Sequence, residues 1–189
     1  MIKMNKLMQE ELLKIKDIDN TFDFTGKLSV INPEMYKVHD CVLMRINDKP
    51  KVSEETIEAA MKYKDFNYDY EHSEFLIGSY FEGITYEQSL RLGLDIVELW
   101  GYKLHALFPE DEFHIIMSVD IESEYDNRVM LRYYKYRGED GFHYDLDELD
   151  KFVFDAILVN VVEAVENYDD EDEEIEDYED NEEESENEM

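Results

Sequence analysis

The chain has 189 residues, of which 43% are hydrophobic and 13% aromatic, so it is long enough to bury the core of one ordinary domain. Its 50 acidic side chains outnumber its 18 Lys and Arg residues and give a formal net charge of −32. A polyanion repels nucleic acids and anionic membranes, so the charge argues against both as direct ligands and favours a basic protein partner.

Other features of the sequence point to a cytoplasmic protein. Cys41 is the only cysteine, so no internal disulfide indicates an oxidising compartment. Residues 1–11 lack the apolar run of a signal peptide, and no stretch reaches the length of a transmembrane helix.

The first third of the chain predicts two helices and two strands. Apolar residues recur at helical spacing over residues 3–18, which favours an amphipathic helix. Residues 24–31 and 36–46 have the alternating pattern of half-buried strands. Ser53 is a plausible N-cap of a short helix over residues 54–64.

The middle of the chain predicts a buried strand and a long helix. Residues 74–82 favour a strand that is buried on both faces. Thr85 and Gln88 have the spacing of a capping box, and a long apolar stripe follows it over residues 86–108. This segment is therefore predicted to be one long helix.

The last third predicts a hairpin and a final interior strand. Residues 113–119 and 129–133 alternate between apolar and polar side chains, which is typical of paired strands. Residues 145–154 favour a short helix. The nearly continuous apolar run at 156–162 indicates a strand in the interior of a sheet.

Strands and helices do not alternate strictly, which favours an α+β fold over a doubly wound one. We expect a single domain over residues 1–167, with a mixed or antiparallel sheet of roughly five to six strands and helices mainly on one face. Residues 169–189 contain 15 acidic and no basic side chains. We therefore expect residues 168–189 to be a disordered acidic tail, because they cannot bury enough surface to offset the cost of ordering.

No common catalytic motif occurs in the sequence. It has no phosphate-binding glycine loop, no His-Glu-x-x-His and no Gly-x-Ser-x-Gly. On a strand, His39 and Cys41 share a face but lie about 7 Å apart, too far for a nucleophile and its base. We predict no catalytic residues.

The histidines and acidic clusters do not have the spacing of metal sites. His105, His114 and His143 match no ligand pattern, and the acidic run 145–150 lacks the central glycine of a calcium loop. We predict no metal and no cofactor. An enzyme or a metal-binding domain with an unrecognised site remains the alternative.

Two acidic stretches without basic residues, 65–90 and 104–127, are the strongest candidates for a partner-binding surface. In the first, tyrosines alternate with acids, and tyrosines are enriched at the energetic centres of protein interfaces. The predicted contact residues are Asp65, Tyr68, Asp69, Tyr70, Glu71 and Glu74, with a second patch of Asp111, Asp120, Glu122 and Glu124.

In size, charge and absence of catalytic motifs, the sequence is similar to small acidic bacterial proteins that neutralise a toxin encoded beside them. The leading hypothesis is an immunity-type inhibitor that occludes a basic toxin, with a nuclease as the expected target. The alternative with the same physics is a phage-type mimic of nucleic acid that blocks a host DNA- or RNA-binding protein. The sequence leaves the oligomeric state open, since repulsion opposes self-association but an exposed strand edge could pair.

Overall fold

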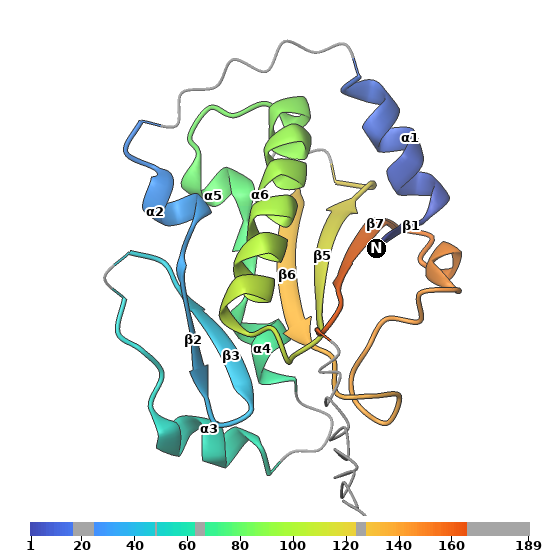
Figure 1. The fold of residues 1–189 in the computed structure, drawn as a ribbon. Coiled ribbons are helices and arrows are strands. Elements are labelled where there is room, and N and C mark those ends of the chain that lie inside the picture. Colours follow the sequence, from blue (N-terminus) through green and yellow to red (C-terminus); the bar gives the residue numbers. More distant parts are fainter. Residues whose placement is uncertain (17–24, 48, 63–66, 124–127, 166–189) are drawn as a thin grey trace, which may run out of the picture.

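The computed structural model describes residues 1–16, 25–47, 49–62, 67–123 and 128–165. It confirms the α+β fold class, with a five-stranded antiparallel sheet and a separate two-stranded sheet (Figure 1). The larger sheet has the strand order β1-β7-β5-β6-β4. Its strands are β1 (Ile2–Met4), β4 (Phe75–Leu76), β5 (Phe113–Asp120), β6 (Val129–Lys135) and β7 (Asp155–Val162). The predicted tail, residues 168–189, lies outside the described residues.

The centre of the large sheet is the predicted hairpin of β5 and β6. Their register pairs Phe113 with Lys135 and Val119 with Val129. β7 pairs with β5 on one side and with β1 on the other, so it is an interior strand, as its continuous apolar run predicts. Strands in this position bury both faces and have no need of polar alternation.

One face of the sheet is covered by α6 (Tyr86–Leu107), the longest helix (Figure 1). Thr85 and Gln88 form the predicted capping box at its start. The apolar stripe of α6 packs against the odd-numbered side chains of β5 in the main core, and Trp100 at its centre is fully buried. A Cβ atom added at Gly93 would lie 3.0 Å from the Met117 sulfur, so this glycine allows the helix to approach β5. Within the described residues, no helix combines the length and the hydropathy needed to cross a membrane.

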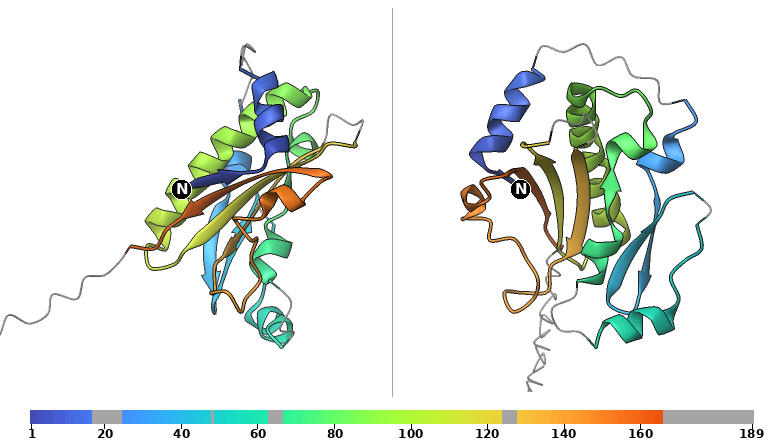
Figure 2. Two further views of the ribbon diagram at one scale, coloured as in Figure 1. Left: turned by 90° about the vertical axis from the view of Figure 1, so that its right-hand side faces the viewer. Right: turned by 180° about the vertical axis from the view of Figure 1, so that it is seen from behind.

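The opposite face of the sheet is covered by the irregular segment 138–154 and by α4 (Tyr68–His72), as the side view in Figure 2 shows. A second apolar cluster lies there, formed by Ile116, Tyr134, Leu149, Ile157, Val159 and Val161. The helix predicted over residues 145–154 is wrong, because only a short 3₁₀ turn, η1 (Leu149–Lys151), forms. Leu149 from this turn is buried against the sheet.

The predicted single strand over residues 36–46 is instead a hairpin of β2 (Glu34–Val38) and β3 (Cys41–Arg45). The chain reverses at His39, which has a φ of 51°. Because Val38 pairs with Cys41, even-numbered residues of β2 lie on the same face as odd-numbered residues of β3. Both faces are apolar: one packs into the main core, and the other packs on α3 (Glu54–Ala60) and α4.

Three further predictions need correction. The helix expected over residues 3–18 begins as strand β1 and continues as α1 (Lys6–Lys14). The strand expected over residues 24–31 contains a helical turn, α2 (Leu28–Ile31). The strand expected over residues 74–82 pairs only through β4 and then becomes α5 (Ile77–Tyr80).

Tertiary contacts explain the position of α2. The indole Nε1 of Trp100 donates to the Ile31 carbonyl at 3.0 Å, and Lys103 Nζ donates to the Pro33 carbonyl at 2.6 Å. The end of α2 is therefore held by side chains of α6, about 70 residues away along the chain. The predicted N-cap of α3 does form, because Ser53 accepts a hydrogen bond from the Thr56 N–H.

Candidate functional site

Asp69, a predicted partner contact, is instead a buried anchor between the hairpin and the large sheet. Its side chain is fully buried in α4. One oxygen accepts the Val42 N–H at 2.8 Å, and the other accepts Arg137 Nη2 at 2.7 Å. Burial raises the pKa of the Asp69 carboxyl, although Arg137 opposes the shift. This carboxylate is not available to a partner at the surface.

Asp111, from the second predicted patch, belongs to the same junction. It is buried and lies 2.9 Å from Lys37 Nζ and 2.8 Å from Lys135 Nζ. Burial alone would raise the pKa of Asp111, but the hydrogen bonds from the two lysines outweigh it and lower the pKa. Asp40 pairs with Lys135 and Arg137. The basic residues of this region therefore neutralise acids inside the fold.

Tyr68 is also buried, so its placement corrects the expectation of an exposed contact. It is 7% exposed and packs against the outer face of the hairpin. Its ring stacks on His72 with a centroid distance of 3.9 Å.

The residues considered for catalysis or metal binding are buried or make contacts within the fold. Cys41 is buried, and burial raises the pKa of its thiol to about 11. His39 Nε2 lies 3.6 Å from Glu58 rather than at the thiol. His114 is buried between Tyr134 and Glu112. Across the described residues, no group of three or more possible ligands could hold a metal ion.

Three of the predicted contacts remain near the surface and lie close together. Tyr70 is half-buried, whereas Glu71 and Glu74 are exposed. The Arg132 guanidinium lies 4.5 Å from the centre of the Tyr70 ring and also pairs with Glu74. The Tyr70 hydroxyl is 2.8 Å from the hydroxyl of Tyr144.

Tyr70 also forms one wall of a pocket of about 380 Å³, which we name the aromatic pocket. The centre of the Tyr70 ring lies 4.8 Å from the centre of the Phe142 ring, and the ring centres of Tyr144 and Phe152 are 5.4 Å apart. Phe142 and Phe152 are both more than one-third exposed. The residues lining the pocket are Tyr70, Phe142, His143, Tyr144, Asp145, Glu148, Lys151 and Phe152.

The segment that builds this pocket carries a concentration of acids. Lysines partly neutralise it, through the pairs Lys3–Asp147, Lys6–Asp150 and Lys151–Glu148. Three other acids of the segment have no ion pair within the described part of the chain: Glu139, Asp140 and Asp145. Apart from Tyr70, sequence reasoning missed this pocket. The available signal was the mixture of aromatic and acidic residues at 139–152.

The second predicted patch is not brought to this pocket. Asp120 lies at the far end of β5, where it accepts the N–H groups of Glu122 and Ser123. None of Asp111, Asp120 and Glu122 lines the pocket. Burial and the neighbouring Asp120 raise the pKa of Asp155, its cross-strand partner. Asp65 and Glu124 lie outside the described residues.

Comparisons with known proteins give a family for this chain. Neither the curated proteins nor the solved structures contain a match. The model of one family, described as "Uncharacterized protein PM0498 family", matches residues 3–168, which is well over half of the chain. The chain therefore belongs to the PM0498 family.

Proposed function

We infer that this protein is a non-catalytic, cytoplasmic binding protein of the immunity type, which occludes a basic toxin, with a nuclease as the expected target. The observation that carries this proposal is the aromatic pocket. Its aromatic side chains stand beside the carboxylates of Asp145 and Glu148. The partner would insert a Lys or Arg side chain there.

The chemistry of the pocket favours a cationic side chain. Aromatic ring faces attract a guanidinium or ammonium group, and a nearby carboxylate adds a charged hydrogen bond. The protein uses this combination within its own fold, since Arg132 lies over Tyr70 and pairs with Glu74. An arginine from a partner would find the same two kinds of contact in the pocket.

The charge of the surrounding surface supports the same partner class. The net charge is −32, and Glu139, Asp140 and Asp145 beside the pocket have no ion pair within the described segments. A field of one sign accelerates the association of an oppositely charged protein by roughly 10- to 1000-fold at low salt. Association with the partner should therefore slow as salt concentration rises.

The surroundings of the buried titratable residues support a binding role. Asp69, Asp111 and His114 are each buried in a hydrogen-bonded pair within the fold. Segment 138–154 instead combines exposed aromatic side chains, Phe142, Phe152 and Phe154, with exposed acids. Such a distribution suits recognition, because interface hot spots combine aromatic anchors with polar rims.

The test uses the protein encoded beside this gene, which we expect to be a basic toxin. Binding would be measured by biolayer interferometry at low and high salt, with the nuclease activity of the neighbour followed in parallel. We expect a complex that suppresses the activity. Phe142→Ala combined with Glu148→Lys should weaken binding at least roughly 30-fold, since a hot-spot residue contributes about 1–3 kcal/mol and two contribute at least about 2 kcal/mol.

The matched control is Glu82→Lys, which makes the same charge change at an exposed residue outside the aromatic pocket. It should leave affinity within about twofold, because distant surface charges are screened. Circular dichroism would verify that each variant folds. Unchanged affinity in the Phe142→Ala/Glu148→Lys variant, or no complex with the neighbour, would refute the proposal.

A further inference from the structure

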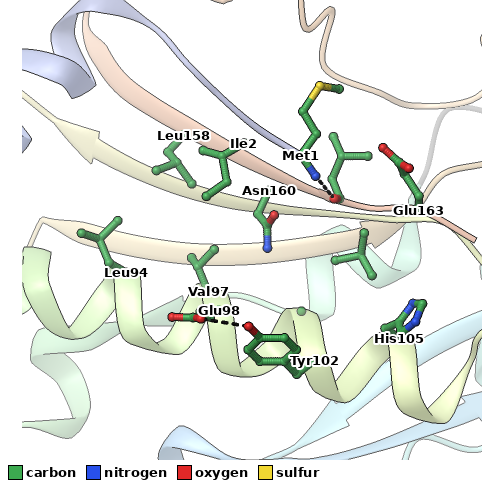
Figure 3. A pocket seen from close by; sticks show the side chains of 13 residues that line it. Met1, Ile2, Leu94, Val97, Glu98, Tyr102, His105, Leu158, Asn160 and Glu163 are labelled. Atoms are coloured by element: carbon green, nitrogen blue, oxygen red, sulfur yellow. Dashed lines mark hydrogen bonds between the residues drawn. The ribbon is translucent and has the colours of Figure 1, made fainter.

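A second hollow lies on the other side of the sheet, between α6 and the strands β7 and β1. It has a volume of about 660 Å³. Figure 3 shows Leu94 and Val97 of α6 facing Ile2 of β1 and Leu158 of β7 across it. The lining is mainly apolar and also includes Glu98, Asn160 and Glu163.

The hollow continues toward the start of α6. An adjoining pocket of about 500 Å³ shares Leu94 with the first and is lined by Met4 and by Leu12 and Leu13 of α1. Together the two pockets form what we name the α6 groove. It follows α6 from Arg91 to His105, a length of about 21 Å at roughly 1.5 Å per residue.

The groove lies where a second helix could cover the part of the sheet that α6 leaves open. A helix is about 10 Å wide and neighbouring strands are about 4.8 Å apart, so one helix covers roughly two strands. α6 packs against β5, and Figure 1 shows β1 and much of β7 to one side of the helix. Apolar side chains at the rim are strongly exposed: Ile2 at 58%, Leu13 at 70% and Tyr102 at 68%.

A polar side chain inside the groove has no partner of its own. The Asn160 side chain points from β7 toward α6 (Figure 3), and none of the described residues hydrogen-bonds to its amide. Gly101 of α6 faces it, and a Cβ atom there would lie 3.0 Å from the Asn160 nitrogen. An amide among apolar side chains gains from a hydrogen-bonding partner. Asn160 therefore offers one donor and one acceptor to an occupant.

Charge selects among the possible occupants. Glu98 and Glu163 line the first pocket and pair with no base in the described part of the chain, whereas Lys16 and Arg91 line the adjoining pocket, where Arg91 pairs with Asp95. A second copy of this chain carries the same charge of −32, and residues 168–189 are themselves acidic. Like charges repel, so both are disfavoured relative to a basic segment.

We propose that the α6 groove is the docking site for an amphipathic, Lys- or Arg-bearing helix of a partner protein. Such a helix would place its apolar stripe against Leu94, Ile2 and Leu13, in the manner of other helix-in-groove complexes. Its polar side would meet Glu98 and Glu163. This inference goes beyond the proposed function and does not depend on the aromatic pocket.

The experiment uses two synthetic 14-residue peptides with the same leucine and lysine composition. In one, the leucines repeat at helical spacing on a single face, and in the other their order is scrambled. Binding to the full chain would be measured by fluorescence anisotropy at physiological salt. The patterned peptide should bind roughly tenfold more tightly, because only it presents a continuous apolar stripe. Its amide shifts in NMR spectra should fall on residues 94–105 and 158–162.

Variants make the test specific for the groove. Leu13→Lys and Ile2→Lys should each weaken binding of the patterned peptide roughly tenfold, because they place a like charge on the apolar rim. The matched control is Leu28→Lys on α2, where the leucine is 68% exposed but does not line the groove. The control should bind as the unchanged protein does.

Three outcomes would overturn the proposal. The first is equal binding of the two peptides, which would indicate attraction by net charge alone. The second is equal affinity of the Leu13→Lys and Leu28→Lys variants. The third is another occupant in the groove. A second copy of the chain would appear as a dimer in light scattering that Ile2→Lys dissociates. The acidic segment 168–189 would be indicated if the full-length variant Ile175→Ser/Tyr178→Ser changed the NMR shifts of groove residues.

Discussion

The buried carboxylate of Asp69 gives the sharpest test of how the hairpin is held on the sheet. Replacement by alanine would leave the Arg137 guanidinium without one of its two acidic partners and the Val42 N–H without an acceptor. An unsatisfied buried N–H costs about 1–3 kcal/mol and a lost hydrogen bond to a charged group about 1.5–3 kcal/mol, which together give about 3–5 kcal/mol. Asp69→Ala should therefore lower the free energy of unfolding by about this amount.

Urea denaturation, followed by tryptophan fluorescence, measures this change. With a slope of about 2 kcal/mol per molar urea, the midpoint should fall by about 1.5–2.5 M. Glu71 is the matched control, because it is exposed and lies two residues further along α4. Glu71→Ala should stay within about 0.5 kcal/mol of the parent, which is usual for surface substitutions.

A double variant identifies the partner responsible. Asp69→Ala combined with Arg137→Met should lower the free energy of unfolding by less than the sum of the two single changes, since each single change breaks the same Asp69–Arg137 ion pair. The expected coupling is about 0.5–3 kcal/mol. Equal midpoints for Asp69→Ala and Glu71→Ala would refute this account of the junction, and additive single changes would exclude Arg137 as the partner.

Three further predictions concern other buried polar groups. Asn5 caps α1 and hydrogen-bonds two backbone groups of β7. Asn5→Ala should therefore lower the free energy of unfolding in urea by about 2–4 kcal/mol, against about 1 kcal/mol for the exposed cap change Ser53→Ala. Equal losses in the two variants would contradict the bridging role of Asn5. Burial lowers the pKa of His114 despite its Glu112 partner, so the unfolded chain takes up this proton first and the unfolding free energy should fall as the pH drops below about 6.5. His114→Phe should reduce that fall between pH 7.5 and 5.5, and an unchanged pH dependence would exclude His114 as its source. Burial raises the pKa of Cys41 to about 11, so a disulfide reagent at pH 8 should react at the rate of unfolding rather than directly, and rapid reaction of the folded protein would show that the thiol is accessible.

The segments that the sequence predicted correctly are those in which the local pattern is also the tertiary pattern. The apolar stripe of α6 and its capping box at Thr85 are properties of neighbouring residues, and both form. β5 and β6 alternate because one face meets α6. β7 is continuously apolar because both its faces are buried. The order of the predicted elements, without strict alternation of strands and helices, likewise indicated the α+β class.

The errors occurred where the local pattern fits two structures. A period-two alternation continues through a tight turn, so residues 36–46 have the same pattern as one strand and as the observed hairpin. The pairing of Val38 with Cys41 reverses which positions share a face, and only contacts with α3, α4 and the main core decide this. The turn of helix in α2 is likewise held by Trp100 and Lys103 from elsewhere in the chain.

The candidate surfaces show the same division. The sequence by itself determined that acids outnumber bases and that tyrosines alternate with acids around Tyr70. Only the tertiary structure decided that Asp69 and Asp111 are neutralised inside the fold and that Phe142 and Phe152 come together beside Tyr70. The physical reason is that burial and ion pairing depend on residues far apart in the chain, which no local pattern of charge or hydropathy specifies.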